Sequence, residues 1–157
     1  MQVFRLARYA RRYDLSGYGA YLLGGRWNLR GRAVLYTAEV RSLAIMEVLV
    51  HLSSEDLPDD MYLLTLDVPE GLSQAELTLE EMPPDWRRAG QPQPTALLGH
   101  AWLESGATLA LRVPSVVVPQ ECNLLLNPAH PEFTQVKLAA EPELFQFDER
   151  LRKAPPA

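Results

Sequence analysis

Short apolar runs separated by glycine and proline dominate this chain, and they read as β-strands. The alternation and composition predict strands at residues 4–6, 33–37, 61–68, 108–113, 115–118, 122–126, 133–138 and 145–147. Two segments favour helices, one from Ser42 to about Leu52 and one from Thr95 to Leu103, with Ser42 and Thr95 as their expected N-caps. Because strands outnumber helices without regular alternation, we expect an α+β fold in which small mixed or antiparallel sheets are flanked by a few helices.

The length of 157 residues fits one domain. We place that domain at residues 1–153 and expect residues 154–157 to be a disordered tail. Residues 15–32 combine five glycines with interleaved aromatic and aliphatic side chains, so they are expected to form a long, ordered loop. Residues 83–94 read as a proline-rich connection anchored by Trp86.

Charge is distributed unevenly along the chain. The net charge is −5, yet residues 1–41 carry +6 and the remainder carries −11. All basic residues of the first part are arginines, whose planar guanidinium binds phosphate through paired hydrogen bonds. This pattern favours a compact anion over a long polyanion, so we expect no direct nucleic-acid binding. A solvated basic face, or a docking surface for an acidic partner, explains the same charges equally well.

The sequence also bears on location and on metal binding. It has no apolar run long enough for a membrane span, and its first residues lack the apolar core of a secretory signal. Cys122 is the only cysteine, which favours a reducing, cytoplasmic setting. His51, His100 and His130 are scattered, and Cys122 forms no known ligand spacing with them, so no metal site is expected.

An arginine and a tyrosine in the first quarter of the chain are candidate ligand-binding groups. Arg26 follows Gly24 and Gly25, which allow the backbone to pass close to a ligand. The alternative is an ordinary turn with a surface arginine. Tyr36 ends the strand predicted at residues 33–37, where its ring can stack on a flat ligand or simply pack in the core.

A carboxylate and a hydroxyl complete the set of candidates. Glu47 is the only charged residue of segment 43–50, and on a helix it shares one stripe with His51 and Ser54. That stripe either lines a cleft or faces water. Ser115 follows Pro114 at an expected bend, where it either points into a cleft or serves a plain turn. No nucleophile elbow surrounds Ser115, so a hydrolase triad is not predicted.

Taken in order, these motifs resemble the RES domain, the toxin half of Xre-RES toxin–antitoxin pairs, over nearly the whole chain. The segments that carry the resemblance are Val3–Leu6, Gly17–Ala20, Gly24–Asn28, Val34–Ala38, Ser42–Ala44, Glu47–His51, Pro84–Trp86, Leu98–Gly99, Trp102–Leu103, Val113–Ser115, Asn123–Pro128 and His130–Pro131. The resemblance implies an ADP-ribosyltransferase-like fold and NAD as substrate, with no metal.

The resemblance further implies a toxin that arrests growth by cleaving the nicotinamide–ribose bond of NAD, as a glycohydrolase or phosphorylase. Matching positions assign catalysis to Glu47, Ser115 and Arg26, and NAD binding to Arg5, Arg26, Tyr36 and Ser115. In this assignment Glu47 stabilises the ribosyl cation, the two arginines hold the diphosphate, Tyr36 stacks near nicotinamide, and Ser115 bonds the nicotinamide or a ribose hydroxyl.

Two alternatives stay open from the sequence. One is a mono-ADP-ribosyltransferase that modifies a cellular protein. The other is a non-catalytic module that binds an acidic partner. The resemblance implies an Xre-type helix-turn-helix antitoxin as partner. Whether water, phosphate or a protein accepts the ADP-ribosyl group is left open, as are a homodimer, the way the antitoxin blocks the site and the identity of any protein target.

Overall fold

The computed structural model describes residues 1–88 and 94–152. The tail predicted at residues 154–157 and part of the proline-rich connection lie outside the described residues, and the domain limits of 1–153 stay a prediction. The helices are α1 (Tyr18–Leu23), α2 (Arg41–Leu49) and α3 (Pro94–Ser105). Short 3₁₀ helices are η1 (Tyr9–Arg11), η2 (Leu79–Glu81), η3 (Pro131–Gln135) and η4 (Glu149–Leu151).

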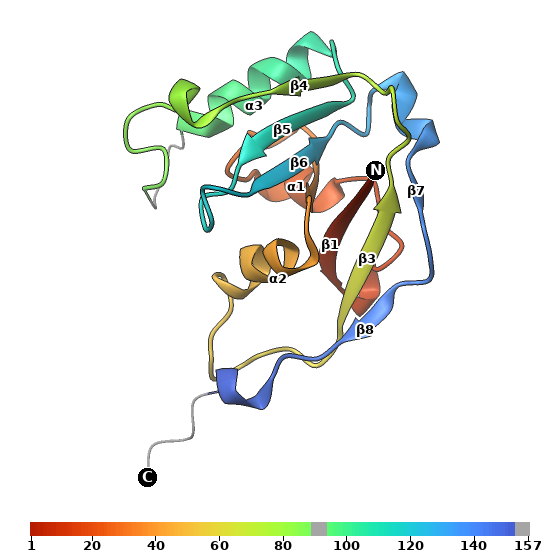
Figure 1. The fold of residues 1–157 in the computed structure, drawn as a ribbon, viewed down its shortest axis with the longest axis vertical. Helices are drawn as coiled ribbons and strands as arrows, with labels where there is room; N and C mark the ends of the chain where they lie inside the picture. The colour runs from red at the N-terminus through yellow and green to blue at the C-terminus, as the bar shows by residue number, and fades with distance from the viewer. Residues whose placement is uncertain (89–93, 153–157) are drawn as a thin grey trace.

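All described strands belong to one sheet, ordered β4-β5-β6-β2-β1-β3-β7, with β8 also pairing with β3 (Figure 1). The strands are β1 (Gln2–Arg8), β2 (Leu35–Ala38), β3 (Met61–Asp67), β4 (Gln74–Glu76), β5 (Ala110–Pro114), β6 (Cys122–Leu126), β7 (Lys137–Leu138) and β8 (Glu143–Phe145). Every pairing is antiparallel except β4 with β5. The predicted α+β class is confirmed, with one mixed sheet in place of several small sheets.

The sheet has a seam between β1 and β2. These two strands pair at a single position, Phe4 opposite Ala38, whereas β1 and β3 pair along seven consecutive residues. In Figure 1, β5 and β6 lie toward the top of the view, and β1 and β3 lie below and to the right of them. The seam therefore divides the sheet into two parts, one formed by β4, β5, β6 and β2 and the other by β1, β3, β7 and β8.

Helices α2 and α3 cover the same face of the sheet. Ala38, Asn123 and Val113 lie opposite one another on β2, β6 and β5, so their side chains share one face. Ala38 packs in the cluster that includes Leu43 of α2, and Val113 packs in the cluster that includes Trp102 of α3. Asn123 therefore lies between the regions that the two helices cover.

The glycine-rich segment contains a helix that the sequence did not predict. Helix α1 lies inside the expected loop at residues 15–32. Gly17 precedes it with a φ of +69°, and a Cβ there would come within 2.7 Å of the Val34 backbone. Gly24 ends it with a φ of +71°. Glycine at both ends and at position 19 lowers the intrinsic helix propensity, which concealed the helix.

Both predicted N-caps are wrong. Helix α2 begins at Arg41 after Val40, with no side-chain cap. Thr95 lies inside α3, where its hydroxyl donates to the carbonyl of Arg26 at 2.7 Å. Because this bond joins residues far apart in the sequence, local cap chemistry could not reveal it.

Several strand predictions also need correction. Residues 115–118 form a loop, because the Ser115 hydroxyl accepts hydrogen bonds from the backbone of Val117 and Val118. Helix η3 occupies the first half of the segment predicted as a strand at 133–138, and β7 occupies only its last two residues. Strand β8 ends at Phe145, where the strand at 145–147 was expected to begin. Strand β4 was not predicted. Within the described residues, no helix has both the length and the apolarity needed to cross a membrane.

Candidate active site

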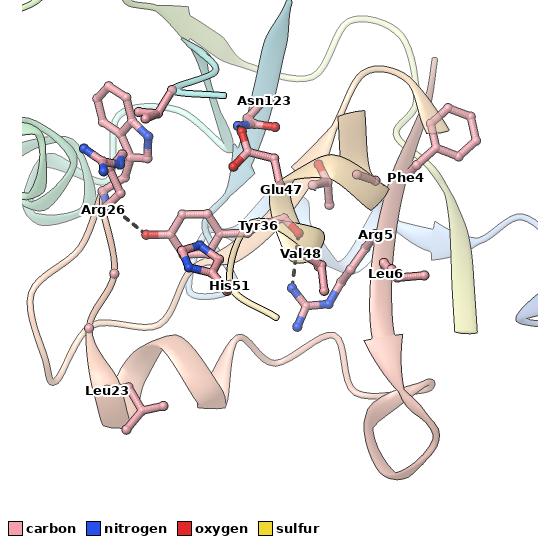
Figure 2. Close-up of a pocket in the computed structure, with 16 residues that line it drawn as sticks. Phe4, Arg5, Leu6, Leu23, Arg26, Tyr36, Glu47, Val48, His51 and Asn123 are labelled. Atoms are coloured by element: carbon pink, nitrogen blue, oxygen red, sulfur yellow. Dashed lines mark hydrogen bonds between the residues drawn. The ribbon is translucent and has the colours of Figure 1, made fainter. Parts of the chain in front are cut away.

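A cavity of about 630 Å³ opens on the sheet face beside α2 and the loop that follows α1. This volume is typical of small-molecule sites. Its wall includes the polar residues Arg5, Arg26, Tyr36, Glu47, His51 and Asn123. In Figure 2, Glu47 points toward Asn123, and Arg26 and Arg5 are seen on either side of Tyr36. Segments far apart in the sequence thus bring cationic, anionic and aromatic groups into one cavity.

Glu47 projects from α2 into this cavity and does not simply face water. Its Oε1 accepts a hydrogen bond from Ser115 Oγ at 2.7 Å and another from Asn123 Nδ2 at 2.5 Å. The side chain is half-buried. Two neutral donors therefore fix the carboxylate while leaving its negative charge intact.

Ser115 lies behind Glu47, not on the cavity wall. It has no exposed surface and is not among the residues that line the cavity. Its hydroxyl donates to Glu47 and accepts from the backbone N–H groups of Val117 and Val118, both at 3.0 Å. The hydroxyl hydrogen is thus engaged by the carboxylate.

Arg26 lies on the loop between α1 and β2, on the side of Tyr36 away from Arg5 (Figure 2). Its Nη1 donates to the carbonyl of Trp86 at 2.7 Å, and its own carbonyl accepts from Thr95. Burial lowers the pKa of the Arg26 guanidinium, while the negative charge of Glu47 raises it. The acid and the guanidinium are therefore close enough to act on each other.

The hydroxyl of Tyr36 holds the Arg26 loop in place. It donates to Asn28 Oδ1 at 2.7 Å and accepts from the backbone N–H of Trp27 at 3.0 Å. A Cβ at Gly25 would lie 2.7 Å from this hydroxyl, so only glycine allows the approach. Burial raises the pKa of Tyr36, which keeps the hydroxyl protonated as a donor.

Helix α3 supports the same loop from behind. A Cβ at Gly99 would lie 1.8 Å from the Trp27 carbonyl oxygen, so the helix and the loop are in backbone contact. Asn28 is buried, and its amide donates to the carbonyls of Ala20, Leu29 and Arg32. The loop that presents Arg26 is thus fixed on several sides.

Arg5 reaches the cavity through the seam of the sheet. Because β1 and β2 pair only at Phe4, the next side chain can extend across, and Arg5 Nη1 donates to the Tyr36 carbonyl at 3.2 Å. Its Nε is buried without a hydrogen-bond partner among the described residues. Burial lowers the pKa of Arg5, and Asp14 opposes that effect.

Sequence reasoning missed the role of Asn123 and placed the helical stripe only in part. Asn123 was noted within a motif but given no site role, because its contact with Glu47 depends on strand register. His51 lines the cavity as the stripe predicted, because backbone turns continue past α2 as far as Leu52, whereas Ser54 lies beyond them and does not line it. Within the described ranges, no group of three or more His, Cys, Asp or Glu side chains is arranged to hold a metal ion.

Comparison with known proteins gives consistent relatives. The model of the RES domain matches residues 2–148. A protein of Sphingobium sp. (strain YBL2) named "Prs ADP-ribosylating toxin" is 43% identical over 157 residues, covering 96% of this chain and 97% of the relative. "Toxin Res" of Pseudomonas putida is 40% identical, covering 96% and 99%. "Toxin Res" of Yersinia enterocolitica is 39% identical, covering 97% and 100%.

A solved structure shares the fold. The crystal structure of the M. tuberculosis MbcT-MbcA toxin–antitoxin complex contains a chain that superposes with a TM-score of 0.66 at 22% identity, covering 92% of this chain and 81% of that chain. The family model and the curated relatives extend over the same residues that form the sheet and the cavity. This chain therefore belongs to the RES domain family.

Proposed function

We propose that this protein is an enzymatic toxin that cleaves the nicotinamide–ribose bond of NAD. The observation that carries the proposal is the placement of Glu47, fixed by Ser115 and Asn123, in one cavity with Arg26. The names of the relatives support the toxin role. The cavity supplies the groups that such a cleavage needs.

Glu47 is the group we assign to the reacting ribose. As the bond to nicotinamide breaks, positive charge develops on the ribosyl carbon and ring oxygen. A preorganised carboxylate stabilises that charge more strongly in the transition state than in the ground state. Removing one such electrostatic group costs on the order of 10²–10³ in rate. The electron pair of the broken bond leaves with nicotinamide, whose ring nitrogen loses its positive charge.

The arginines and Tyr36 bind the rest of the substrate. Arg26 and Arg5 approach the cavity from different elements and carry the positive charge that a diphosphate requires. Tyr36 lines the cavity between them, and its ring provides a surface for nicotinamide. Since Ser115 is buried and donates to Glu47, we propose that it acts by orienting the carboxylate.

Two acceptors for the ADP-ribosyl group deserve a direct test. The first is water or phosphate, which would deplete NAD. The second is a side chain of a cellular protein, and the name "Prs ADP-ribosylating toxin" of the 43% identical relative favours it. Neither choice alters the assignment of Glu47, because both reactions pass through the same ribosyl cation.

Product analysis with labelled NAD separates these outcomes. The purified protein is incubated with NAD labelled in the adenosine, with and without phosphate and with and without a cell lysate, and Glu47→Gln is the control. Free ADP-ribose or its phosphorylated form indicates depletion, whereas label on a protein band indicates transfer. If the folded protein yields neither free ADP-ribose, nor its phosphorylated form, nor labelled protein, the result contradicts the proposal and favours a binding role.

We propose an antitoxin as the physiological partner. The structural neighbour was solved as a toxin–antitoxin complex, which supports a protein partner for this chain. An Xre-type helix-turn-helix protein is the specific expectation. Co-expression of the neighbouring gene should restore growth, and its product should co-purify with this chain. Failure of both would exclude that gene product as the antitoxin.

A further inference from the structure

The two hydrogen bonds of the Glu47 carboxylate meet at one oxygen. Ser115 Oγ and Asn123 Nδ2 both donate to Oε1, and no hydrogen bond joins Oε2 to any described residue. The carboxylate is therefore held asymmetrically, with one oxygen engaged by the protein. The remaining oxygen belongs to a side chain that lines the cavity.

We propose that Asn123 is a positioning residue that holds Glu47 by Oε1 so that Oε2 is presented to the bound ligand. The identity of that ligand rests on the function proposed above. Asn123 suits this task because β6 is paired on both sides, with Ala38 and Val113 opposite residue 123. Its amide is thus mounted on a rigid part of the sheet, where a donor can fix a partner precisely.

The chemistry of the donor matters as much as its placement. Glu47 can only accept hydrogen bonds when ionised, so Asn123 must turn its amide nitrogen toward it. An amide holds the carboxylate without cancelling its charge, whereas a lysine or arginine in direct contact would weaken the field available to a ribosyl cation. Asn123 and Ser115 therefore orient the acid while sparing its charge for the ligand.

Asn123→Asp tests this directly, because aspartate has the shape of asparagine and accepts where asparagine donates. In this variant two carboxyls meet at the Oε1 position, so they share one proton until the pH is high enough to remove it. At low pH the shared proton replaces the amide hydrogen bond. At high pH both acids are charged and repel, which moves Glu47 away from its working position.

Other titratable groups face Glu47 in the same cavity. Arg26 comes from the loop after α1, Arg5 from β1, Tyr36 from β2 and His51 from the turn that follows α2. They are unchanged by the substitution, so the parent protein is the reference for their titration. Asn127→Asp is the matched control, because Asn127 is also buried and its Oδ1 accepts from the Ala129 N–H, a role that aspartate retains.

Steady-state NAD turnover should be measured from pH 5 to 8.5 for the parent protein, Asn123→Asp, Asn123→Ala and Asn127→Asp. We expect kcat of Asn123→Asp at pH 8 to fall about 100-fold, the loss caused by a displacement of about 1 Å, with KM nearly unchanged. Activity should recover toward pH 5 in Asn123→Asp, stay low at every pH in Asn123→Ala, and follow the parent in Asn127→Asp. A parent-like kcat at pH 8, or a raised KM with kcat unchanged, overturns the proposal.

A second measurement does not depend on NAD. Carboxyl ¹³C NMR titration of the Asn123→Asp protein should show residues 47 and 123 titrating as a coupled pair. Independent titration of the two acids overturns the proposal, whatever the activity. If the parent protein does not turn over NAD, the proposed function fails, and the NMR titration decides the positioning role alone.

Discussion

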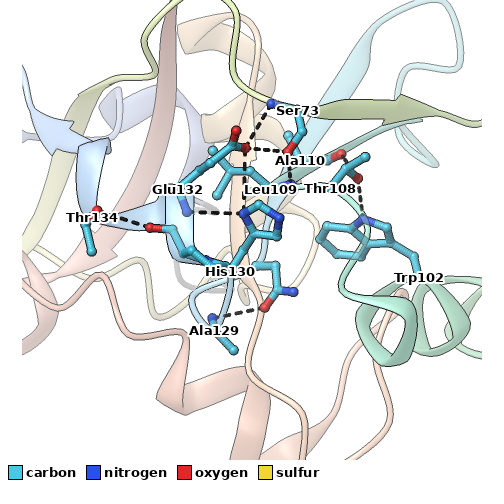
Figure 3. Close-up of polar contacts among 11 residues, drawn as sticks. Ser73, Trp102, Thr108, Leu109, Ala110, Ala129, His130, Glu132 and Thr134 are labelled. Atoms are coloured by element: carbon cyan, nitrogen blue, oxygen red, sulfur yellow. Dashed lines mark hydrogen bonds and ion pairs between the residues drawn. The ribbon is translucent and has the colours of Figure 1, made fainter.

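Two carboxylates of this protein have similar partners but different surroundings. Glu47 accepts hydrogen bonds from a serine hydroxyl and an asparagine amide, and Glu132 accepts from the hydroxyl and the backbone N–H of Ser73. The Glu132 cluster also includes His130, whose Nδ1 lies 3.6 Å from the carboxylate (Figure 3). Seen as residue types alone, serine, histidine and glutamate would make Glu132 the more obvious active site.

The hydrogen bonds in the Glu132 cluster argue against an active site there. Ser73 bonds Glu132 directly, and its hydroxyl also accepts from the Leu109 N–H, while His130 Nδ1 accepts from the backbone N–H of Glu132. The imidazole therefore does not lie between the serine and the acid, and no proton relay exists among them. This cluster ties η3 to the ends of β4 and β5. The difference lies in the surroundings: Glu47 is anchored and lines the cavity, whereas Glu132 is not among the residues that line it.

The sharpest contrast comes from removing each charge in turn. Glu47→Gln should lower NAD turnover by on the order of 10²–10³, because the amide cannot stabilise a ribosyl cation, while the folded structure is retained. Glu132→Gln should turn over NAD at the parent rate. Nicotinamide release and thermal unfolding of both variants check this. Equal loss of turnover in the two variants would contradict the assignment of Glu47, and not Glu132, to the reaction.

Arg26 tests whether the cavity recognises its ligand by contact or by general charge. Arg26→Ala should weaken NAD binding by about tenfold to 100-fold, since a hydrogen bond to a charged group contributes about 1.5–3 kcal/mol. Arg8→Ala is the control, because Arg8 is exposed, pairs with Asp60 and carries the same charge. Calorimetric titration with NAD measures both. Similar weakening in the control would point to the long-range field of the basic segment.

Tyr36→Phe separates the ring from the hydroxyl. The ring surface is kept, but the Trp27 N–H and Asn28 Oδ1 lose their partner, which costs about 1–3 kcal/mol of unfolding free energy. Because these bonds hold the Arg26 loop, we expect NAD binding to weaken by about tenfold. Denaturant unfolding and NAD titration are the measurements. Parent-like affinity together with reduced stability would leave stacking as the only contribution of Tyr36 to the ligand.

The smallest effect concerns acid stability at the Glu132 cluster. Hydrogen bonds from Ser73 lower the pKa of Glu132 below its ordinary value of 4.5. The carboxylate therefore contributes stability that is fully present above pH 4.5 and is lost as the pH falls through the lowered pKa of the folded protein. Glu132→Gln should be less stable than the parent at pH 7, and the difference should shrink below pH 4.5. Thermal unfolding across pH 3–7 checks this, and a constant difference would contradict it.

The residues that line the cavity were easier to predict from the sequence than the residues that hold them in place. Arg26, Tyr36 and Glu47 could be proposed because their types match one chemistry, and the structure places all three on one cavity wall. The support by Asn123 could not be proposed, because it depends on which strand lies beside β2. The buried position of Ser115 was likewise hidden, since a loop with hydroxyl-to-backbone bonds resembles a strand in composition.

The fold shows the same division between local and long-range information. Strands β2, β3, β5 and β6 were predicted within two residues of their observed limits, because alternation and apolar content are local signals, whereas only the centre of β1 was predicted. Strand β4 has only three residues, and its parallel pairing with β5 is set by the chain that connects them. Such a short element carries too little pattern to be recognised without its neighbour.

The single point of pairing between β1 and β2 leaves few backbone hydrogen bonds between the two parts of the sheet. Tyr36 and Asn123 lie on β2 and β6, the Arg26 loop leads into β2, and Arg5 lies on β1, so a ligand held by both arginines would connect the two parts of the sheet. Such a ligand would hold the two parts of the sheet together. Amide hydrogen exchange near Phe4 and Ala38 should therefore slow on ligand binding, far more than exchange within the seven-residue pairing of β1 with β3.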